Sequence, residues 1–392
     1  MTPQIEYTKV SSPEDAQPLG SILDQCFNSP PGTSESYFNR IGLENFRTIS
    51  QAGQLAGGLA IIPMGQWFGT ECVPMAGIAA VGIAPEYRGS GAAIALLQNT
   101  LKELHAKGVP ISALYPATQR LYRKAGYEQG GSYCTWEIPT ESIQLKERLL
   151  PLHPVADINQ EVLRSLYQQQ AKLTNGYLDR NQAIWQGILK SDEKEAVYTY
   201  LIGSADHPEG YIIFTPHQTE DGSILRIRDW VVLTTAAARS LWTFLNDHRS
   251  QIQKVRWRGS IVDSLTLLLP EQTAKIRSVQ RWFLRVVDLR KALEKRGYPS
   301  GIQTELHLEV QDNLLPENNG KFILSVLNGR GEVTQGGKGE LKLDVGGLAP
   351  LYTGLFTAHQ LQLAGQLEAT ETALSTATQL FAGASPWMPD FF

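Results

Sequence analysis

The sequence predicts a multidomain α/β protein with mixed, partly parallel sheets. At roughly 150 residues per domain, 392 residues correspond to two or three domains. Apolar runs at Met75–Ala84 and Val109–Tyr115 predict strands, and Gly91–Lys107 between them has the apolar spacing of a helix. A helix that joins two strands through tight turns predicts that the two strands lie parallel. Short glycine-punctuated strands near the end of the chain predict a further α+β segment.

Composition and turn residues divide the chain into three segments. Residues 1–145 begin with an amphipathic helix at Asp15–Phe27 and include a strand at Gln54–Pro63. Residues 146–285 repeat the strand and helix order more loosely, and residues 286–392 have a different, glycine-rich composition. Further elements are predicted at Glu161–Lys172, Ala196–Gly203, Gly210–Pro216, Arg226–Leu233, Ala236–His248, Lys254–Gly259, Phe322–Val326 and Glu371–Phe381.

The overall composition excludes several classes of protein. A formal charge of −4, from 35 Lys and Arg against 39 Asp and Glu, argues against a nucleic-acid-binding surface. No apolar run approaches the length of about 18 residues that a membrane span needs, and the start lacks the pattern of a signal peptide. Three scattered cysteines are too few for a disulfide framework or a zinc cage. We therefore expect a soluble cytoplasmic protein that binds no membrane, nucleic acid or metal.

The loop between the predicted strand and helix of the first segment has the composition of a phosphate-binding loop. Glycines at Gly89 and Gly91 remove Cβ atoms where backbone N–H groups would approach a ligand. The free N–H groups and dipole of the following helix favour a phosphate, and Arg88 adds a fixed positive charge. The alternative is a simple glycine turn between a strand and a helix.

Two motifs in this segment resemble those of the GNAT acyltransferase superfamily. Arg88-Gly89-Ser90-Gly91-Ala92-Ala93 resembles the Arg-x-x-Gly-x-Gly/Ala pyrophosphate motif, and Leu121–Glu128 resembles the Tyr-x-x-x-Gly-Phe/Tyr segment. In the second motif the hydroxyl of Tyr122 would lie near the thioester sulfur, where a phenol can protonate a departing thiolate. The alternative is that Tyr122 is an amphipathic helix residue with a solvated hydroxyl.

The resemblance implies a site for acetyl-CoA as co-substrate. In GNAT proteins the strand before the loop pairs with the pantetheine arm through its backbone, the loop holds the pyrophosphate, and a later segment flanks the thioester. The residues of this chain at those positions are Val81 and Ile83 on the strand, Arg88, Gly89, Gly91 and Ala92 in the loop, and Ala117 and Thr118 near the thioester.

The remaining two segments extend the resemblance over the whole chain. After the strand Arg226–Leu233 the sequence reads Thr234-Thr235-Ala236, without the glycine motif, so we expect a degenerate GNAT copy that does not bind coenzyme A. Trp282–Leu293 and Leu380–Phe392 resemble the Eis (enhanced intracellular survival) family of N-acetyltransferases. In that family two GNAT-like domains precede a sterol-carrier-protein-like α+β domain, which here would be residues 286–392.

The Eis resemblance also implies a general base. In that family the C-terminal carboxylate enters the active site, so the carboxylate of Phe392 would accept a proton from the acceptor amine while Tyr122 acts as the acid. The alternative is a frayed tail, which the apolar and stiff residues of the last segment argue against. Asp24 and Phe27 border the expected acceptor cleft; Asp24 either attracts an ammonium group or is a solvated helix residue.

The resulting hypothesis is an acetyl-CoA-dependent N-acetyltransferase. It would transfer acetyl to a primary amine of an aminoglycoside, a polyamine or a lysine side chain, by direct attack in a ternary complex. The resemblance implies a homo-oligomer, hexameric as in the Eis family. The alternative is an apolar-ligand binding protein that uses the C-terminal domain for a lipid or sterol-like molecule, with an idle or regulatory acyl-CoA site.

Overall fold

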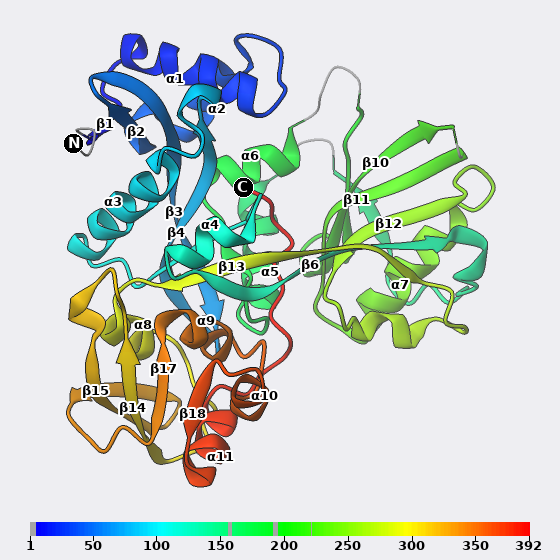
Figure 1. Cartoon of the computed structure of the whole chain (residues 1–392). Coiled ribbons are helices and arrows are strands. Elements are labelled where there is room, and N and C mark those ends of the chain that lie inside the picture. Colours follow the sequence, from blue (N-terminus) through cyan, green and yellow to red (C-terminus); the bar gives the residue numbers. More distant parts are fainter. Residues whose placement is uncertain (1–4, 156–158, 191–194, 221) are drawn as a thin grey trace. The chain divides into compact units, whose positions relative to one another are not determined.

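The chain divides into two compact units, which Figure 1 shows as a computed structural model. The structure describes residues 5–155, 159–190, 195–220 and 222–392. Unit 1 comprises residues 1–130 and 282–383 together with Phe392, and unit 2 comprises residues 131–281 and 384–391. Each unit is therefore assembled from segments that lie far apart in the sequence. None of the helices in the described ranges is long and apolar enough to cross a membrane.

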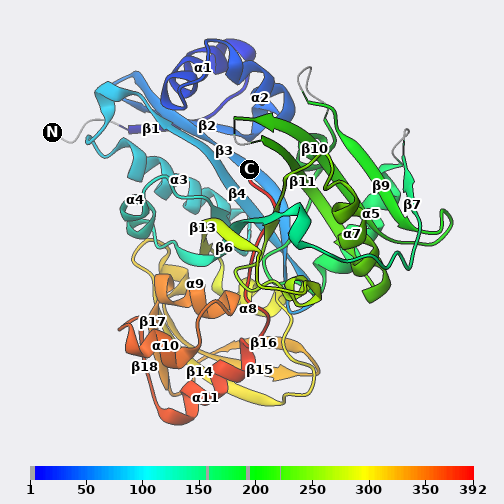
Figure 2. The same ribbon diagram turned by 90° about the vertical axis from the view of Figure 1, so that its right-hand side faces the viewer.

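The N-terminal part of unit 1 consists of one mixed sheet with helices on both faces (Figures 1 and 2). The strand order is β1-β2-β3-β4-β5-β13, and the pair β4 and β5 is parallel. The elements are β1 (Ile5–Lys9), α1 (Pro13–Cys26), α2 (Thr33–Ile41), β2 (Phe46–Gln51), β3 (Gln54–Phe68), β4 (Glu71–Ile83), α3 (Ala92–Ala106), β5 (Ile111–Leu114), α4 (Gln119–Lys124) and the end of β13 (Lys275–Val286).

The two faces of this sheet carry separate hydrophobic cores. Successive side chains of a strand point to opposite faces, so β3 contributes to both cores. Ile61 packs in the same cluster as Leu97 of α3, whereas Ala60 and Ile62 pack in the same cluster as Leu19 of α1. The helices α1 and α3 therefore bury opposite faces of the sheet.

The C-terminal part of unit 1 is a second, five-stranded sheet in the order β16-β15-β14-β17-β18. Alternate residues of β14, Leu306, Leu308 and Val310, are buried, so one face of this sheet packs against helices. The elements are α8 (Leu289–Lys295), β14 (Thr304–Gln311), β15 (Gly320–Leu327), β16 (Arg330–Gln335), β17 (Leu341–Asp344), α9 (Val345–Thr353), α10 (Ala358–Leu363), β18 (Leu367–Ala369) and α11 (Glu371–Leu380).

Unit 2 has a mixed sheet in the order β6-β12-β11-β10-β9-β7. Its parallel pair is β11 with β12, and α5 and α7 both pack on β10 and β11. The elements are β6 (Glu128–Pro139), β7 (Leu152–Pro154), α5 (Gln160–Ala171), β8 (Leu178–Asp179), α6 (Gln182–Leu189), β9 (Tyr198–Gly203), β10 (Pro208–Thr219), β11 (Gly222–Val232), α7 (Thr235–Asp247) and β12 (Lys254–Gly259).

The predicted fold class, with mixed and partly parallel sheets, is confirmed. The predicted helix Gly91–Lys107 is α3, which ends at Ala106 with Lys107 as its C-cap, and Gly108 follows with the positive φ of +68° that a glycine stop provides. The predicted strand Lys254–Gly259 is β12 with the same bounds. Elements that were not predicted from the sequence include α2 and β13.

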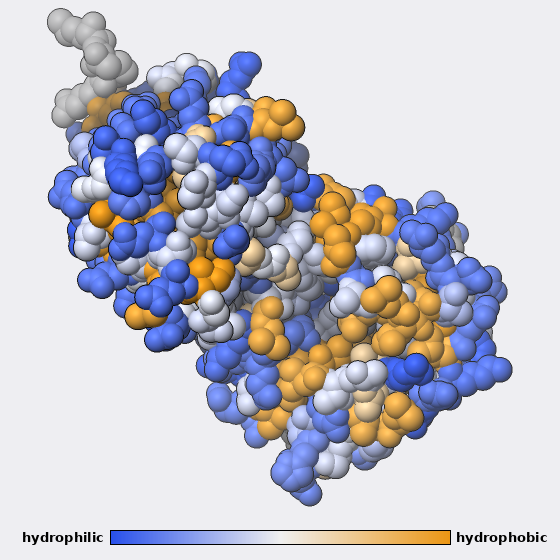
Figure 3. Space-filling view, turned by 90° about the horizontal axis from the view of Figure 1, so that it is seen from below, coloured by the Kyte–Doolittle hydropathy of each residue, from blue (hydrophilic) through white to orange (hydrophobic). Residues whose placement is uncertain are grey.

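Apolar side chains also reach the surface. Figure 3 shows one face of the molecule on which such side chains gather, and the large exposed apolar residues include Leu173, Val262, Leu267 and Leu363. Extended apolar surface of this kind commonly serves contacts with other molecules.

A polar cluster joins α3 to the edge of the sheet in unit 1. Glu103 of α3 accepts hydrogen bonds from Arg47 Nε and Nη2 at 2.8 and 2.6 Å, from Lys107 Nζ at 2.6 Å and from Tyr7 Oη at 2.6 Å. Burial alone would raise the pKa of Glu103, but these donors outweigh it and lower the pKa to about 2. The cluster therefore stabilises the fold only while Glu103 is ionised.

We predict that Glu103→Gln lowers the free energy of unfolding by about 1–3 kcal/mol at pH 7, because it removes charge-assisted hydrogen bonds to Arg47. A carboxyl whose pKa is depressed on folding stabilises the protein above its unfolded pKa of 4.5 and loses that contribution as the pH falls toward 2. The free energies of unfolding of wild type and variant, measured with urea, should therefore converge as the pH falls through that range. Glu86→Gln, which changes an exposed carboxylate, is the control and should be as stable as wild type. A Glu103→Gln variant as stable as wild type at pH 7 would contradict the prediction.

Candidate active site

The candidate site lies where β4 and β5 separate. The two strands pair in parallel over only three residue pairs, which end at Gly77 with Ala113. The register of β4 with β3 then shifts around Ala80, which has a φ of +49°, so β4 carries a bulge at Ala80 and Val81. A bulge bends its strand and increases the local twist. The carboxyl half of β4 therefore continues without β5 as a neighbour.

The loop that follows β4 presents unused backbone donors. Gly89 and Gly91 have φ values of +82° and +91°, and a Cβ built on either would meet no atom within 4 Å. The helix α3 begins after Gly91 without a side-chain cap, and within the described residues no acceptor binds the N–H groups of Gly89, Gly91, Ala93 and Ile94. These donors at a helix N-terminus fit a phosphate.

Arg88 lies at the start of this loop with an exposed side chain. Its Nε donates to the carbonyl of Ile83 at 3.3 Å, and its Nη2 lies 3.7 Å from Cys26 Sγ. The guanidinium therefore folds back over the end of β4, and its remaining donors stay available to an anion.

The structure brings most of the predicted cofactor residues together. Ile83, Ala92 and Tyr122 belong to one hydrophobic cluster, and Val81 packs against it. Ala117 and the helix cap residue Thr118 precede α4 and are exposed. The end of β4, the start of α3 and the helix that carries Tyr122 thus pack in one cluster.

Tyr122 lies on α4 and its side chain is largely buried, with an exposed fraction of 4%. Its ring packs edge-on against Tyr127, with the ring centroids 6.2 Å apart. Burial raises the pKa of Tyr122 to about 12. The phenol therefore keeps its proton throughout the neutral range, as a proton donor must.

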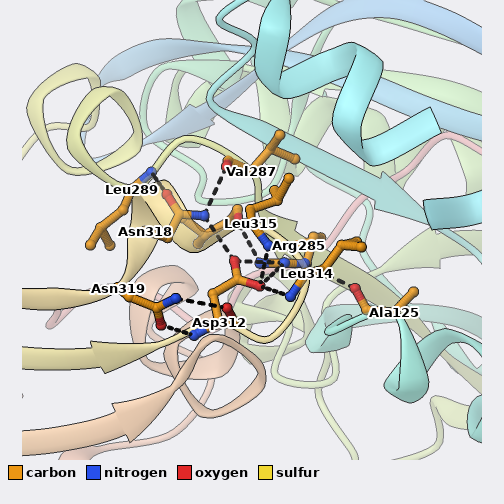
Figure 4. A network of polar contacts seen from close by, with 10 residues as sticks. Ala125, Arg285, Val287, Leu289, Asp312, Leu314, Leu315, Asn318 and Asn319 are labelled. Atoms are coloured by element: carbon orange, nitrogen blue, oxygen red, sulfur yellow. Dashed lines mark hydrogen bonds and ion pairs between the residues drawn. The ribbon is translucent and has the colours of Figure 1, made fainter. Parts of the chain in front are cut away.

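A buried ion pair holds the segment that follows Tyr122 (Figure 4). Both side-chain oxygens of Asp312 lie 2.7 Å from Arg285 Nη2, and Arg285 Nε donates to the carbonyl of Ala125 at 3.0 Å. Asn318 Nδ2 donates to Asp312 Oδ2 at 2.9 Å and the backbone of Leu315 donates to Oδ1 at 3.1 Å. The C-terminal part of unit 1 thereby fixes the end of α4.

The last residue of the chain lies against the point where β4 and β5 part. A Cβ built on Gly77 would lie 2.6 Å from the ring of Phe392, so the ring packs on bare β4 backbone. The ring also packs edge-on against Tyr115, with the centroids 5.9 Å apart. Phe392 is partly buried in the cluster that contains Leu19 and Phe46. The chain therefore ends at the candidate site rather than in a frayed tail.

The preceding tail, residues 384–391, is anchored within unit 2. Asp390 accepts hydrogen bonds from the buried Arg180 Nε at 3.0 Å, and Arg180 also binds Asp229 at 2.6 and 2.9 Å. The carbonyl of Pro389 accepts from Arg258 Nη1 at 3.0 Å. The tail is thus held by charge-assisted hydrogen bonds as well as by its apolar residues.

The two predicted acceptor residues lie at the end of α1. The side chain of Asp24 is buried, with an exposed fraction of 7%, and accepts from the N–H groups of Gly32 at 2.7 Å and Ser34 at 2.9 Å. Asp24 is therefore not the solvated residue of the alternative; it caps the start of α2. Phe27 follows α1 with 55% of its surface exposed. Asp24 also lines a cavity of about 570 Å³ between α1 and α2.

Unit 2 repeats the strand arrangement without the phosphate loop. The strand β11 pairs in parallel with β12 only at residues 224–226, and its register with β10 shifts at Arg228. The helix α7 starts three residues after β11, and Thr234 Oγ1 accepts from the N–H of Ala237 at 3.1 Å. The helix N-terminus is therefore capped by its own side chain.

Comparisons with known families agree with this arrangement. A model of the acetyltransferase (GNAT) domain matches residues 8–130, a second GNAT-domain model matches 176–286, and a model of the sterol carrier protein domain matches 289–389. A GCN5-related N-acetyltransferase from Anabaena variabilis, of known crystal structure, is 64% identical, with a TM-score of 0.97 over 99% of this chain and 100% of that one. The chain is a GCN5-related N-acetyltransferase of the Eis family.

More distant relatives also match this Eis-family enzyme over most of its length. The N-acetyltransferase Eis of Mycobacterium tuberculosis is 25% identical over 78% of this chain and 77% of its own. An uncharacterized N-acetyltransferase of Streptomyces griseus is 26% identical over 80% of this chain and 81% of its own. The predicted family, fold class and enzyme class are therefore confirmed, whereas the individual residue roles and the domain boundaries at 145 and 285 stay predictions.

Two buried ion pairs of the Eis-family enzyme, Arg285 with Asp312 and Arg180 with Asp390, were not predicted from the sequence. Arg285 lies in the apolar run Trp282–Val287, and an arginine between buried strand residues indicates a paired charge. Arg180 has no such context, and its partner Asp390 lies 210 residues away in sequence. The sequence around Arg180 therefore does not indicate that this arginine forms a buried ion pair.

We predict that Asp312→Asn destabilises the enzyme by about 3–5 kcal/mol, because the fully buried Arg285 would lose its only counter-ion among the described residues. Urea unfolding measures the change. Asp288→Asn, which removes the partner of the exposed Lys291, is the control and should cost less than about 1 kcal/mol. Equal stability of the two variants would show that the pair in Figure 4 is not a major constraint.

Proposed function

We propose that this enzyme transfers the acetyl group of acetyl-CoA to a primary amine at the opening between β4 and β5. The observation that carries the proposal is the uncapped N-terminus of α3, whose glycines leave room for a pyrophosphate after the part of β4 that no longer pairs with β5. Val81 and Ile83 offer their backbone to the pantetheine arm, and Ala117 and Thr118 flank the thioester. Arg88, Gly89, Gly91 and Ala92 hold the phosphates.

The amine attacks the thioester carbon directly in a ternary complex. The nitrogen forms the new C–N bond, the C–S bond breaks, and the coenzyme A thiolate takes the proton of Tyr122. Burial raises the pKa of Tyr122 to about 12, so the phenol is protonated before the step and gives up its proton only to the developing thiolate. The amine proton goes to the C-terminal carboxylate of Phe392, directly or through a water.

The acceptor is a cationic amine of the aminoglycoside, polyamine or lysine class. The cavity between α1 and α2 supports this class, because the carboxylates of Glu14, Asp24 and Glu35 line it and no lysine or arginine among the described residues does so. Phe27 stands exposed at the end of α1 and offers an apolar contact to the body of the acceptor.

The proposal includes a division into a catalytic domain at 1–145, a GNAT-like domain without a phosphate loop at 146–285 and a sterol-carrier-like domain at 286–392. It also includes a cytoplasmic homo-oligomer, hexameric by family resemblance. The cavity of about 350 Å³ in the C-terminal sheet is lined largely by polar residues such as Glu309, Lys342 and Glu368. That lining favours the transferase over a carrier of apolar ligands.

We predict that Gly91→Asp weakens acetyl-CoA binding at least tenfold, because a carboxylate at the start of α3 would repel the pyrophosphate. Isothermal titration with acetyl-CoA measures the affinity. Gly53→Asp is the matched control: Gly53 has a φ of +76° with no atom within 4 Å of a built Cβ, so it imposes similar backbone strain away from the loop. Wild-type affinity in Gly91→Asp would mean that the loop is only a turn.

Tyr122→Phe should lower kcat by about 10²- to 10⁴-fold while changing the acetyl-CoA affinity less than twofold, because it removes a proton donor and little contact area. A thiol-release assay with spermidine, kanamycin and a lysine peptide measures kcat. Tyr127→Phe is the control, since it removes a neighbouring hydroxyl that bonds Ser112 Oγ at 2.8 Å. A Tyr122→Phe enzyme as fast as Tyr127→Phe would exclude the general acid.

Removal of Phe391 and Phe392 should reduce thiol release at least 100-fold without unfolding the protein, because it removes the proposed base and keeps Asp390 and Pro389, which anchor the tail. The side chain of Phe391 is 59% exposed, so Phe391→Ala controls for its loss. Addition of two glycines after Phe392 moves the carboxylate but keeps every side chain, and it should lower turnover similarly. Full activity of the truncated enzyme would refute the carboxylate base.

A further inference from the structure

Unit 2 contains a cavity of about 450 Å³ for which neither the fold nor the proposed reaction provides a use. Its lining comes from Trp230 and Val232 at the end of β11, from the segment after β12, from Tyr177 and from Trp387 of the tail. The parallel pairing of β11 with β12 ends at Arg226, before these residues. The cavity therefore lies at the carboxyl ends of two separating strands, where α/β proteins commonly bind ligands.

The walls of this cavity are aromatic and firmly held. Trp230 packs against Trp242 and Trp257 with ring centroids 5.9 and 6.1 Å apart. Tyr177 and Trp387 form an edge-to-face pair at 4.9 Å, and Gln170 Nε2 donates to Tyr177 Oη at 3.2 Å. Rings fixed in this way present π-faces and edges without further ordering on ligand binding.

One carboxylate contributes the charge of the cavity. Asp263 Oδ2 accepts from Trp257 Nε1 at 3.1 Å and Oδ1 accepts from the N–H of Leu265 at 3.0 Å. Within the described residues Asp263 forms no ion pair, and no lysine, arginine or histidine lines the cavity. Burial raises the pKa of Asp263, in keeping with a carboxylate that lacks a cation.

The same features exclude coenzyme A as the occupant. The N–H of Val232 donates to Gln170 Oε1 at 3.1 Å, so the strand end is not available to pair with a pantetheine arm. The N-terminus of α7 is capped by Thr234, and the lining carries a negative rather than a positive side chain. An anionic phosphate ligand would meet repulsion here.

We propose that this cavity binds a small organic ammonium ion with an aromatic body. Asp263 pairs with the ammonium group, and the tryptophan and tyrosine rings hold the body and add cation–π attraction. The site is separate from the α3 loop and goes beyond the proposed acetyl transfer, so its occupancy needs no acetyl-CoA.

Isothermal titration of the full-length protein with phenethylamine at pH 7, without acetyl-CoA, tests the proposal. We expect saturable binding by wild type, and binding at least tenfold weaker for Asp263→Asn, in which the amide oxygen still accepts one of the two hydrogen bonds. Asp247→Asn, at an exposed carboxylate of α7, is the matched control and should bind as wild type does. The neutral analogue 2-phenylethanol should bind at least tenfold more weakly than phenethylamine.

A second variant tests the cavity without its carboxylate. Ser264→Trp adds bulk at an exposed lining residue and should also weaken phenethylamine binding at least tenfold. Wild-type affinity in both variants, or equal binding of the amine and the alcohol, would overturn the proposal. Thiol release from acetyl-CoA should stay at the wild-type rate in Asp263→Asn, so failure of this proposal and failure of the acetyl-transfer proposal give different results.

Discussion

The short parallel pairing of β4 with β5 is the constraint on which the site depends. Three residue pairs hold the strands together up to Gly77, and the bulge at Ala80 then turns β4 away. Beyond this point β4 no longer pairs with β5, the carbonyl of Ile83 accepts from Arg88 Nε, and the loop to α3 starts from the same strand end. Phe392 lies at Gly77 itself, so the chain terminus reaches the point where the strands part.

Unit 2 shows what happens when the same strand geometry is kept and the loop is lost. The parallel pairing of β11 with β12 ends at Arg226, and the bulge in β11 follows at Arg228. The connection to α7 is short and Thr234 caps the helix, so the donors that Gly91 leaves free in α3 are satisfied internally. Both units therefore share the short parallel pairing, and the residues after the strand determine whether the following helix leaves backbone donors available to an anion.

Local sequence was sufficient for much of this arrangement. Helix α3, its glycine stop and the β4–β5 pair follow from apolar period and turn residues, and Gly89 and Gly91 predict the open loop before α3. The role of Asp24 did not follow, because its partners are the backbone N–H groups of Gly32 and Ser34 at the start of α2, and backbone partners leave no mark in the sequence. The pairs Arg285–Asp312 and Arg180–Asp390 depend on tertiary contacts that no local period encodes.

The ion pair of Arg285 with Asp312 explains why the helix that carries Tyr122 depends on the C-terminal part of unit 1. Tyr122 sits on a helix of six residues, which is too short to be stable by itself. The carbonyl of Ala125 after this helix accepts from Arg285, whose charge is balanced by Asp312 in the C-terminal part of unit 1. Loss of Asp312 would leave the buried charge of Arg285 without its partner. The resulting destabilisation would act on the segment after Tyr122, whose carbonyl at Ala125 binds Arg285. The sterol-carrier-like domain thus contributes to the site through a fixed charge, independently of any ligand of its own.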